Sequence, residues 1–515
     1  MSDIELRNVD GAIVGYDPET GERVPVSFEG LDVSSVATSE VAGIADHVIT
    51  TKADLQALPD ELSSGETVWI GRVEHDEVVE IDGVDNVTIT GSGMDSSRVT
   101  TADGSNSGLF HVGRNSPVGK ITIKNITIDG NSANNSGDTD FATPIWTGDV
   151  DELVVDTISF VDTIEPDGRS NTSTIRAYYP TRRVKIRDCE FHGNVTRHVE
   201  SSCRELHVTD SFFENAIERS ISLDSFVPNN RLTQRAFIRS NDLRVGPEGS
   251  AVGAHVGGEG LDSTFVGAAP VDPVGDPIEK YVFRDNDITG VKRVGFAIRD
   301  ATQGEFEYIN NDIEGAEEHG IINIRTGDSD QSIINPGSIT IHRGTIRDTG
   351  AAAIQVGNSS NINISEVIAY DNPIKVSPAD SASIDNCEVF GAVQSPSIAI
   401  GGISNSGHIR NCTVQNPSRT AILTDSPSLS VEHCDVTGAA ENYDTIRVTG
   451  DECRIVHCYV EGVPGALPRH AIFCPSINNV VAIGNIAKNI GGNVVQLHRS
   501  TGISENNYTQ PVESS

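Results

Sequence analysis

A short strand-like phrase recurs along the chain, and its spacing constrains the fold more than any other feature. Most copies carry an apolar residue, two further positions, a Cys or Asn, and then another apolar residue. The copies are ITIKNITIDGN (121–131), VKIRDCEFHGN (184–194), LHVTDSFFENA (206–216), ASIDNCEVFGA (382–392), GHIRNCTVQNP (407–417), LSVEHCDVTGA (429–439) and CRIVHCYVEGV (453–463). Such a unit is typical of short β-strands, and it buries its apolar face only by stacking on its neighbours.

A second short strand lies between successive phrases. The spacing of its last inward-facing residue along the sequence, here called the ruler, measures the length of the repeat. Its last inward-facing residue is expected at Val356, Val376, Ile400, Leu423, Val448, Phe473 and Leu497, which are 20 to 25 residues apart. A period near 24 residues with two or three strands per repeat fits one rung of a parallel β-helix. We therefore expect an all-β, single-stranded parallel β-helix of about fifteen rungs, roughly 70 Å long at the strand spacing.

Extended towards the N-terminus, the ruler becomes irregular. Its expected positions are Ala177, Val199, Leu223, Val256, Ile298 and Ile324, and the spacing widens to as much as 42 residues. The middle rungs, about 140–330, therefore carry insertions, and the longest of these spans about 246–279. The rungs over 331–500 have a regular length without long insertions. Insertions on one face of a solenoid are where function is usually found.

The two ends of the chain differ from the repeat. The segment 51–63 reads as an amphipathic capping helix, with Thr51 as N-cap and Asp54 at the capping-box position. Residues 12–27 read as a β-hairpin around a Pro/Gly turn, within a small head and linker over 1–47 that is too short for a core of its own. The β-helix is expected over 48–510, with a C-terminal tail over 501–515.

The cysteines follow the repeat. Cys387, Cys412, Cys434 and Cys458 hold the same phrase position in successive rungs, and Cys189 matches it earlier. They are expected to form a ladder of small buried side chains about 4.8 Å apart. Because there is no CxxC pair and no His-rich cluster, a zinc site is not expected, and disulfides between rungs depend on geometry.

The composition is strongly acidic, with 74 Asp and Glu against 37 Lys and Arg and a formal net charge of -37. A chain with this charge is not expected to bind nucleic acid or an anionic membrane surface. No apolar run is long enough to span a bilayer, and no signal peptide is seen. Only 8 of the basic residues are Lys, and this composition indicates a halophilic origin, since molar salt screens the self-repulsion of an acidic surface.

In the second strand, residues that flank the inward position should point outward, because strand side chains alternate. Charged and aromatic residues gather in this outward stripe on the insertion-bearing rungs, and planar, aromatic and Arg side chains suit a glycan. The candidate binding residues are Trp146, Arg176, Tyr178, His198, His255, Arg299 and Arg325.

Two readings of chemistry in the stripe stay open. Glu200 and Asp224 fall at equivalent positions on adjacent rungs, about 5 Å apart, which suits a glycosidase pair with one raised pKa. Alternatively, His198 or His255 acts as a base while an Arg neutralises a uronic acid, as in a lyase. A purely structural origin, with chance carboxylates paired to Arg or a trimer interface, explains the same residues.

The capping helix followed by GETVWIG (65–71) and VTITGSG (87–93) resembles the pectin-lyase-like right-handed parallel β-helix superfamily over about 48–510. The short head before the cap, together with the charge, resembles tailspikes and receptor-binding tail proteins of tailed viruses, here of a virus infecting haloarchaea. This resemblance implies a right-handed coil, a virion location and a homotrimer that binds, and sometimes cuts, host surface glycans. The polygalacturonase motifs are absent, with Glu318-His319-Gly320 the nearest fragment, and no aspartate cluster matches the calcium site of pectate lyases.

The leading hypothesis is a virion tail spike or fibre protein that binds a host glycan or glycoprotein through the outward face of the middle rungs. Residues 1–47 would attach it to other tail proteins. The alternatives are a glycosidase or lyase acting on acidic surface polysaccharide and a structural decoration protein. No cofactor is expected, and bound cations are allowed although no metal site can be placed.

Overall fold

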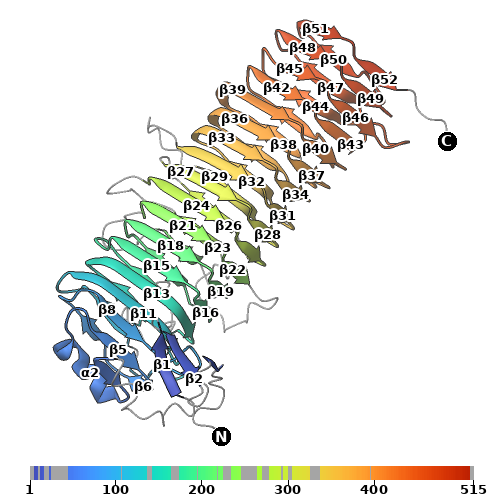
Figure 1. The fold of residues 1–515 in the computed structure, drawn as a ribbon. Helices are drawn as coiled ribbons and strands as arrows, with labels where there is room; N and C mark the ends of the chain where they lie inside the picture. The colour runs from blue at the N-terminus through green and yellow to red at the C-terminus, as the bar shows by residue number, and fades with distance from the viewer. Residues whose placement is uncertain are drawn as a thin grey trace.

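The computed structural model describes the backbone of the head strands and most of residues 45–510. Within 45–510 it leaves out 106, 136–141, 164–172, 194, 217–218, 224–232, 245–263, 269–277, 292–293, 300–303, 325–336 and 395. The chain winds as a right-handed parallel β-helix from α2 at one end to β51 and β52 at the other (Figure 1). The predicted fold class is confirmed.

One wall of the coil is a parallel sheet of sixteen strands, here called the 16-stranded sheet. Its strands are β7 (Val79–Ile81), β10 (Phe110–Val112), β12 (Ile145–Thr147), β14 (Ser173–Ala177), β17 (Arg197–Ser201), β20 (Arg219–Ser222), β23 (Thr264–Ala268), β26 (Val294–Arg299), β29 (His319–Ile324), β32 (Ala352–Val356), β35 (Ile374–Val376), β38 (Ile398–Ile400), β41 (Ile422–Thr424), β44 (Asp444–Val448), β47 (His470–Pro475) and β50 (Val495–His498). This sheet corresponds to the expected ruler strand.

Two further columns of parallel strands complete each rung, and β11 and β13 run through both. The second column holds β4 (His47–Ile49), β5 (Thr67–Ile70), β8 (Val87–Thr90), β11 (Val118–Asp129), β13 (Val150–Val161), β15 (Arg183–Arg187), β18 (Glu205–Thr209), β21 (Arg235–Arg239), β24 (Lys280–Arg284), β27 (Glu305–Ile309), β30 (Ser338–His342), β33 (Ser359–Ser365), β36 (Ala379–Asp385), β39 (Ile403–Arg410), β42 (Leu429–Glu432), β45 (Arg454–Val456), β48 (Val480–Ile483) and β51 (Gly502–Glu505). The third column holds β6 (Arg72–His75), β9 (Arg98–Thr101), β16 (Glu190–Phe191), β19 (Phe212–Glu214), β22 (Asp242–Arg244), β25 (Asp287–Thr289), β28 (Asp312–Glu314), β31 (Thr345–Arg347), β34 (Ile368–Tyr370), β37 (Glu388–Phe390), β40 (Thr413–Gln415), β43 (Asp435–Ala439), β46 (Tyr459–Gly462), β49 (Ile486–Lys488) and β52 (Tyr508–Gln510).

The corner between the second and third columns is a tight bend at one left-handed residue. Asp188 and Asp210 have φ of 51° there, and Asn386 and Asn411 have 53°. Asp and Asn tolerate this conformation better than other side chains do. The bend repeats in nearly every rung, which explains why the phrase places Asn or Asp before its Cys or second apolar residue.

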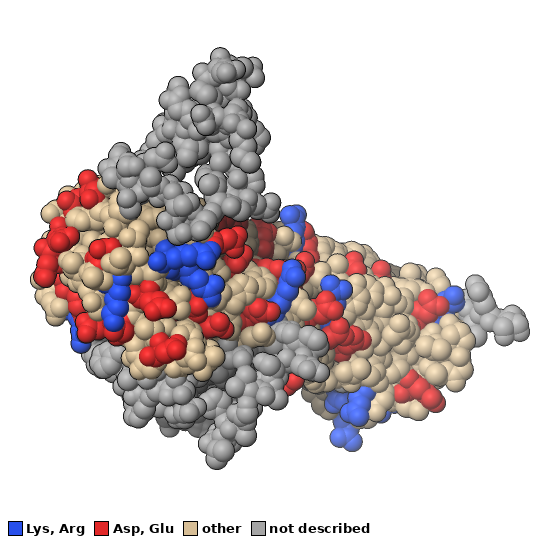
Figure 2. All heavy atoms as spheres, turned by 90° about the horizontal axis from the view of Figure 1, so that it is seen from below, with Lys and Arg blue, Asp and Glu red and all other residues tan. Residues whose placement is uncertain are grey.

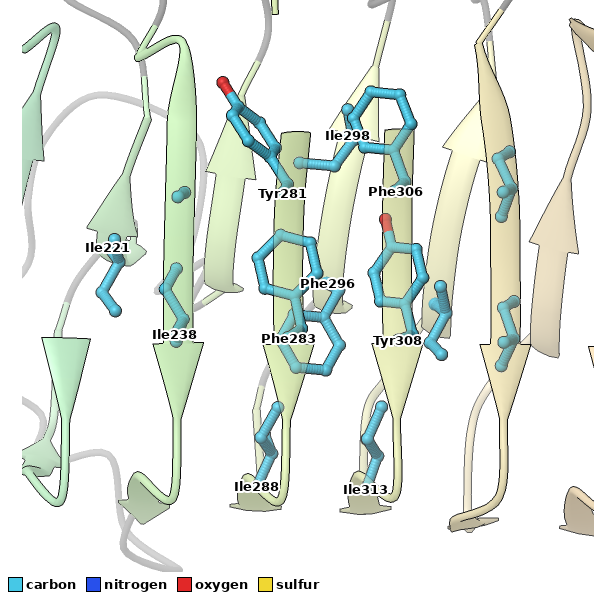
Figure 3. Close-up of a cluster of buried hydrophobic side chains, with 14 of the residues drawn as sticks. Ile221, Ile238, Tyr281, Phe283, Ile288, Phe296, Ile298, Phe306, Tyr308 and Ile313 are labelled. Carbon is cyan, nitrogen blue, oxygen red and sulfur yellow. The ribbon is translucent and has the colours of Figure 1, made fainter. Parts of the chain in front are cut away.

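The interior is a continuous stack of apolar side chains. The rings of Phe283 and Tyr308 stack with centroids 4.9 Å apart, and Phe296 from the opposite wall lies 4.9 Å from Phe283 (Figure 3). Inside the corner, Asn241, Asn286 and Asn311 form a ladder in which each side-chain nitrogen donates to the next Asn or to a backbone carbonyl, for example Asn286 Nδ2 to Asn311 Oδ1 at 2.8 Å. This polar ladder satisfies backbone groups at the bend.

The ruler was correct for most rungs and wrong at particular positions. Leu423 and Phe473 were expected inward, but their neighbours fill the core instead and both side chains are only half-buried. The rung expected at Val256 falls outside the described residues, and the strand found between β20 and β26 is β23. Asn323, rather than Ile324, pairs with Ile298 and Val356.

The helical cap is confirmed at one end. Helix α2 spans Lys52–Glu61, and Thr51 and Asp54 form the reciprocal capping box. Leu55 and Leu58 are fully buried against the first rungs. In the head, β2 (Ala12–Tyr16) and β3 (Arg23–Val24) form the expected hairpin, and β1 (Glu5–Val9) adds an antiparallel strand that was not expected. At the other end, β51 and β52 extend the coil to Gln510, into the segment expected to be a tail.

The cysteine ladder is confirmed, since all eight cysteines are buried and reduced. Each thiol of the ladder donates to backbone carbonyls, as Cys412 Sγ does to Ile384 and Arg410 at 3.5 and 3.3 Å. Burial raises the pKa of Cys189, and likewise of Cys203 and Cys474, to about 12. These three thiols are therefore protonated, and all eight are shielded from solvent in the folded chain.

This arrangement predicts that the native protein does not react with a thiol reagent such as dithionitrobenzoate. In denaturant, without reductant, all eight thiols should react, because none is held in a disulfide. The measurement is the absorbance change per chain before and after unfolding. Fewer than eight reactive thiols in the unfolded chain would show that the ladder is oxidised.

Candidate functional site

The candidate site lies on the outer side of the 16-stranded sheet near its N-terminal end. Strand register places one side chain from each of β7, β10, β12, β14, β17 and β20 in a line, here called the outward row. Its members are Glu80, His111, Trp146, Arg176, Glu200 and Ser222. The residues before them in the strands, such as Phe110, Ile145 and Ile175, are fully buried in the core, so alternation directs the row away from it.

Glu200 is fully buried and bonded on both oxygens. Ser173 Oγ and Arg176 Nε donate to Oε2 at 2.7 and 3.1 Å, and Tyr178 Oη donates to Oε1 at 3.2 Å. Arg197, itself 1% exposed, lies 3.8 Å from the same carboxylate. A carboxylate without solvent contact and with these donors has no free edge for a substrate, so it orders its neighbours rather than acting as a proton donor.

The expected pairing of Glu200 with Asp224 is wrong in register. Glu200 pairs with Ser222 on the next rung, two residues before Asp224. The error arose because the sequence alignment equated Val199 with Leu223, whereas Val199 pairs with Ile221, two residues earlier. Asp224, His255 and Arg325 lie outside the described residues, as does the side chain of Arg299, whose backbone forms the end of β26.

His198 does not belong to the outward surface. Its ring lies among the core phenylalanines, with centroids 5.5 Å from Phe191 and 5.9 Å from Phe213. Its Nε2 donates to the Glu214 carbonyl at 3.0 Å, and its buried Nδ1 has no hydrogen-bond partner among the described residues, which suits a neutral imidazole. Burial lowers the pKa of His198 to about 3. The expected outward placement of His198 is therefore wrong.

Four of the expected residues do meet: Trp146, Arg176, Tyr178 and Glu200. Trp146 and Tyr178 are half-buried and meet edge to face, with centroids 6.3 Å apart at 87°. The Arg176 guanidinium lies over the Tyr178 ring, 5.6 Å from its centroid. The Glu200 carboxylate thus anchors both Arg176 and Tyr178, which form one side of the Trp146 ring surface.

The row continues to His111 and Glu80, which sequence reasoning missed. The His111 ring lies 5.5 Å from Trp146, and its Nδ1 is 3.5 Å from Glu80 Oε1, which also binds Arg114 at 3.0 Å. Burial lowers the pKa of His111, opposed by the charge of Glu80. The signal available in the sequence was the alternation Phe-His-Val in a short strand before the first expected stripe residue.

A shallow hollow of about 230 Å³ on the second column was also missed. Its floor includes Val154 and its rim carries Lys120, Lys124, Lys185 and Arg187 beside Glu152 and Asp156. Glu152 binds Lys185 at 3.2 Å and Asp156 binds Arg187 at 2.6 Å. Figure 2 shows how such basic side chains lie among acidic ones on the face in view.

The outward row has no closely spaced carboxylate pair among its described residues. Its two carboxylates, Glu80 and Glu200, are separated by four rungs, which is roughly 19 Å at the strand spacing. A glycosidase pair requires about 5–9.5 Å. Within the row, Trp146 and Glu80 are partly exposed, whereas Arg176 and Glu200 are buried.

Comparison with known proteins concerns the β-helix fold. Residues 275–436 match the family model described as a right-handed β-helix region. No curated protein matches the chain. Among solved structures, the chain is similar to the A-module of mannuronan C-5 epimerase AlgE6 from Azotobacter vinelandii, with 14% identity over 90% of this chain and 96% of that one and a TM-score of 0.29.

Two further structures have comparable similarity. The catalytic unit of a GH87 α-1,3-glucanase from Streptomyces thermodiastaticus has 14% identity over 89% of this chain and 67% of that one, with a TM-score of 0.31. PfbA, a surface adhesin of Streptococcus pneumoniae, has 11% identity over 87% of each chain, with a TM-score of 0.29. At these values the function of the present chain has to be argued from its own residues.

The described residues contain neither a candidate metal cluster nor a helix suited to crossing a bilayer. No group of three His, Cys, Asp or Glu side chains among them is arranged to hold a metal ion. In the same part of the chain, no helix has the length and apolar character needed to cross a bilayer.

Replacing the buried carboxylate tests its anchoring role. Glu200→Gln removes the charge that faces Arg176 and Arg197, and breaking a buried pair in this way costs about 3–5 kcal/mol of unfolding free energy. Denaturant unfolding monitored by circular dichroism measures this loss. Glu388→Gln, at an exposed position of β37, serves as the control and should change stability by less than about 0.5 kcal/mol. An equally stable Glu200→Gln protein would contradict the anchoring role.

The buried His198 predicts a loss of stability in acid. Its folded pKa lies below the unfolded value of 6.5, so the unfolded chain binds the proton more readily and stability falls as the pH drops from about 6.5 towards about 3. At pH 5 the contribution is about 2 kcal/mol at 1.36 kcal/mol per pH unit. Unfolding at pH 7 and pH 5 should therefore differ less for His198→Gln than for the wild type, while His498→Gln, at an exposed site, should behave like the wild type.

Proposed function

We propose that the protein is a glycan-binding spike or adhesin that holds a surface polysaccharide on the outward row. The observation that carries this proposal is the ring surface of Trp146 and Tyr178, fixed from behind by Arg176 and the buried Glu200. Pyranose rings bind to fixed aromatic faces, and a site ordered before binding loses little entropy when the ligand arrives.

Binding without cleavage is the form of this proposal that the residues favour. Glu200 has all its described contacts inside the protein, and the other carboxylate of the row is too distant to form a pair with it. A polysaccharide hydrolase or lyase on the same coil is the competing function, and product formation separates the two. No cofactor is part of the proposal.

The biological setting is inferred from the charge of the chain and from its head. A net charge of -37 with few Lys suits molar salt, and a three-stranded head separate in pattern from the coil suits attachment to another protein. We place the protein in the tail of a virus infecting halophilic cells, attached through residues 1–47 to other tail proteins and assembled as a homotrimer. Determining the mass of the purified protein assembly in molar salt tests whether it contains three copies of the chain.

The binding proposal is tested with acidic exopolysaccharide purified from haloarchaeal cultures, in molar salt. Trp146→Ala should weaken binding at least about tenfold, or ~1.4 kcal/mol, because the main ring surface is lost. Tyr370→Ala is the matched control, since Tyr370 is an exposed aromatic residue on β34, away from the row. Surface plasmon resonance gives both affinities.

The same incubation decides between binding and cleavage. We expect no new reducing ends and no absorbance from unsaturated uronate after prolonged incubation with the wild-type protein. Release of either product would replace the binding proposal with the enzyme. Unchanged affinity of Trp146→Ala would remove the outward row as the binding site.

A further inference from the structure

A cluster of arginines and aromatic rings lies at the other end of the 16-stranded sheet, on its outer side. Register aligns Leu423, Arg447, Phe473 and Gln496 on β41, β44, β47 and β50. The core beneath is filled by the neighbouring positions, including Ile446, Ile472 and Cys474, which are fully buried. The aromatic–arginine platform is defined as Arg419, Tyr443, Arg447, Arg469, His470 and Phe473.

The rings of the platform hold its guanidinium groups in place. The Cζ atoms of Arg447 and Arg469 lie 5.9 and 5.7 Å from the Phe473 ring centroid. His470 stacks on Phe473 at 5.7 Å and 11°. Arg419 lies over Tyr443, 5.6 Å from its centroid, and Tyr443 is 40% exposed. Cation–π contact orients a guanidinium without using its N–H groups, which stay available at its edge.

The arginines of the platform differ in their partners. Arg469 binds the buried carboxylate of Asp444 through two nitrogens at 2.9 and 2.5 Å. Arg419 and Arg447, both exposed, form no ion pair and no side-chain hydrogen bond with any described residue. In a chain with twice as many acidic as basic residues, two exposed and oriented arginines without a carboxylate partner leave donors for an external anion.

We propose that this platform is a second saccharide site that binds the carboxylate or sulfate group of an acidic polysaccharide. Arg419 and Arg447 supply paired N–H donors in the geometry that such groups accept. Tyr443 and Phe473 supply apolar ring surface for the sugar, and beside them the exposed Asn493 donates its side-chain amide to Gln496 Oε1. The site goes beyond the proposed outward row and does not depend on it.

The two sites are far apart on one face. Ten rungs separate β14 from β44, which is roughly 48 Å at the strand spacing. A short acidic oligosaccharide therefore occupies the sites independently, whereas a long chain can span both and gain affinity through effective concentration. The dependence of affinity on the length of the saccharide, and the number of saccharides bound per chain, then distinguish independent binding from binding that spans both sites.

The experiment uses the full chain in molar salt with an alginate tetrasaccharide as the acidic probe and a neutral dextran fragment as the comparison. Isothermal titration calorimetry should show tetrasaccharide binding that Arg447→Gln weakens at least about tenfold at the platform. The matched control is Arg454→Gln, an exposed arginine on β45 in the second column. The variants replace exposed side chains, so their circular dichroism and melting temperature should equal those of the wild type.

The Trp146→Ala background separates this inference from the outward-row proposal. In that background the tetrasaccharide should still bind with one site per chain, and adding Arg447→Gln should weaken this remaining binding at least about tenfold. If Arg447→Gln binds the tetrasaccharide like the wild type, or if the neutral dextran fragment binds the platform equally well, the inference is wrong. It is also wrong if Arg447→Gln changes only the sedimentation of the protein, since the platform would then be a contact between copies of the chain.

Discussion

Parallel stacking of rungs through backbone hydrogen bonds is the constraint on which the rest of the structure depends. Each strand finds its partners only on the rungs before and after it, so every residue has a fixed neighbour about 4.8 Å away. Side chains distant in sequence, such as Arg176 and Glu200, become adjacent on one face. The outward row, the cysteine ladder and the aromatic–arginine platform are all products of this register.

The repeat pattern was sufficient to predict the coil, the capping helix at 52–61 and the buried cysteines, because each follows from periodicity or capping chemistry. The exact register was harder to predict. At Leu423 and Phe473 the ruler chose the larger apolar residue, whereas the core takes the smaller Thr424 and Cys474 on the inner side. One residue of displacement reverses the face, whereas the displacement at Asp224 was two residues. At His198 the ring lies against Phe191 and Phe213 although the next residue, Val199, is inward as expected.

The site shows why outward position does not imply reactivity. Glu200 was identified from the sequence as a candidate acid, and Arg176 and Tyr178 as ligand contacts, but the sequence does not reveal that they satisfy each other. The structure shows Glu200 shielded from solvent, with hydrogen bonds from Ser173 and Arg176 on β14 and from Tyr178 just after it. Desolvated ion pairs of this kind contribute more to a defined arrangement than to net stability. The half-buried rings of Trp146 and Tyr178, rather than the carboxylate, are therefore left for a ligand.

The most direct test of the account is a crystal structure of the full chain grown in molar salt and soaked with an acidic oligosaccharide. The account predicts sugar rings lying against the outer side of the 16-stranded sheet, over the Trp146 indole, with Glu200 still enclosed by its protein donors. Sugar density bound away from this sheet, or a sugar bond held between two carboxylates, would contradict it.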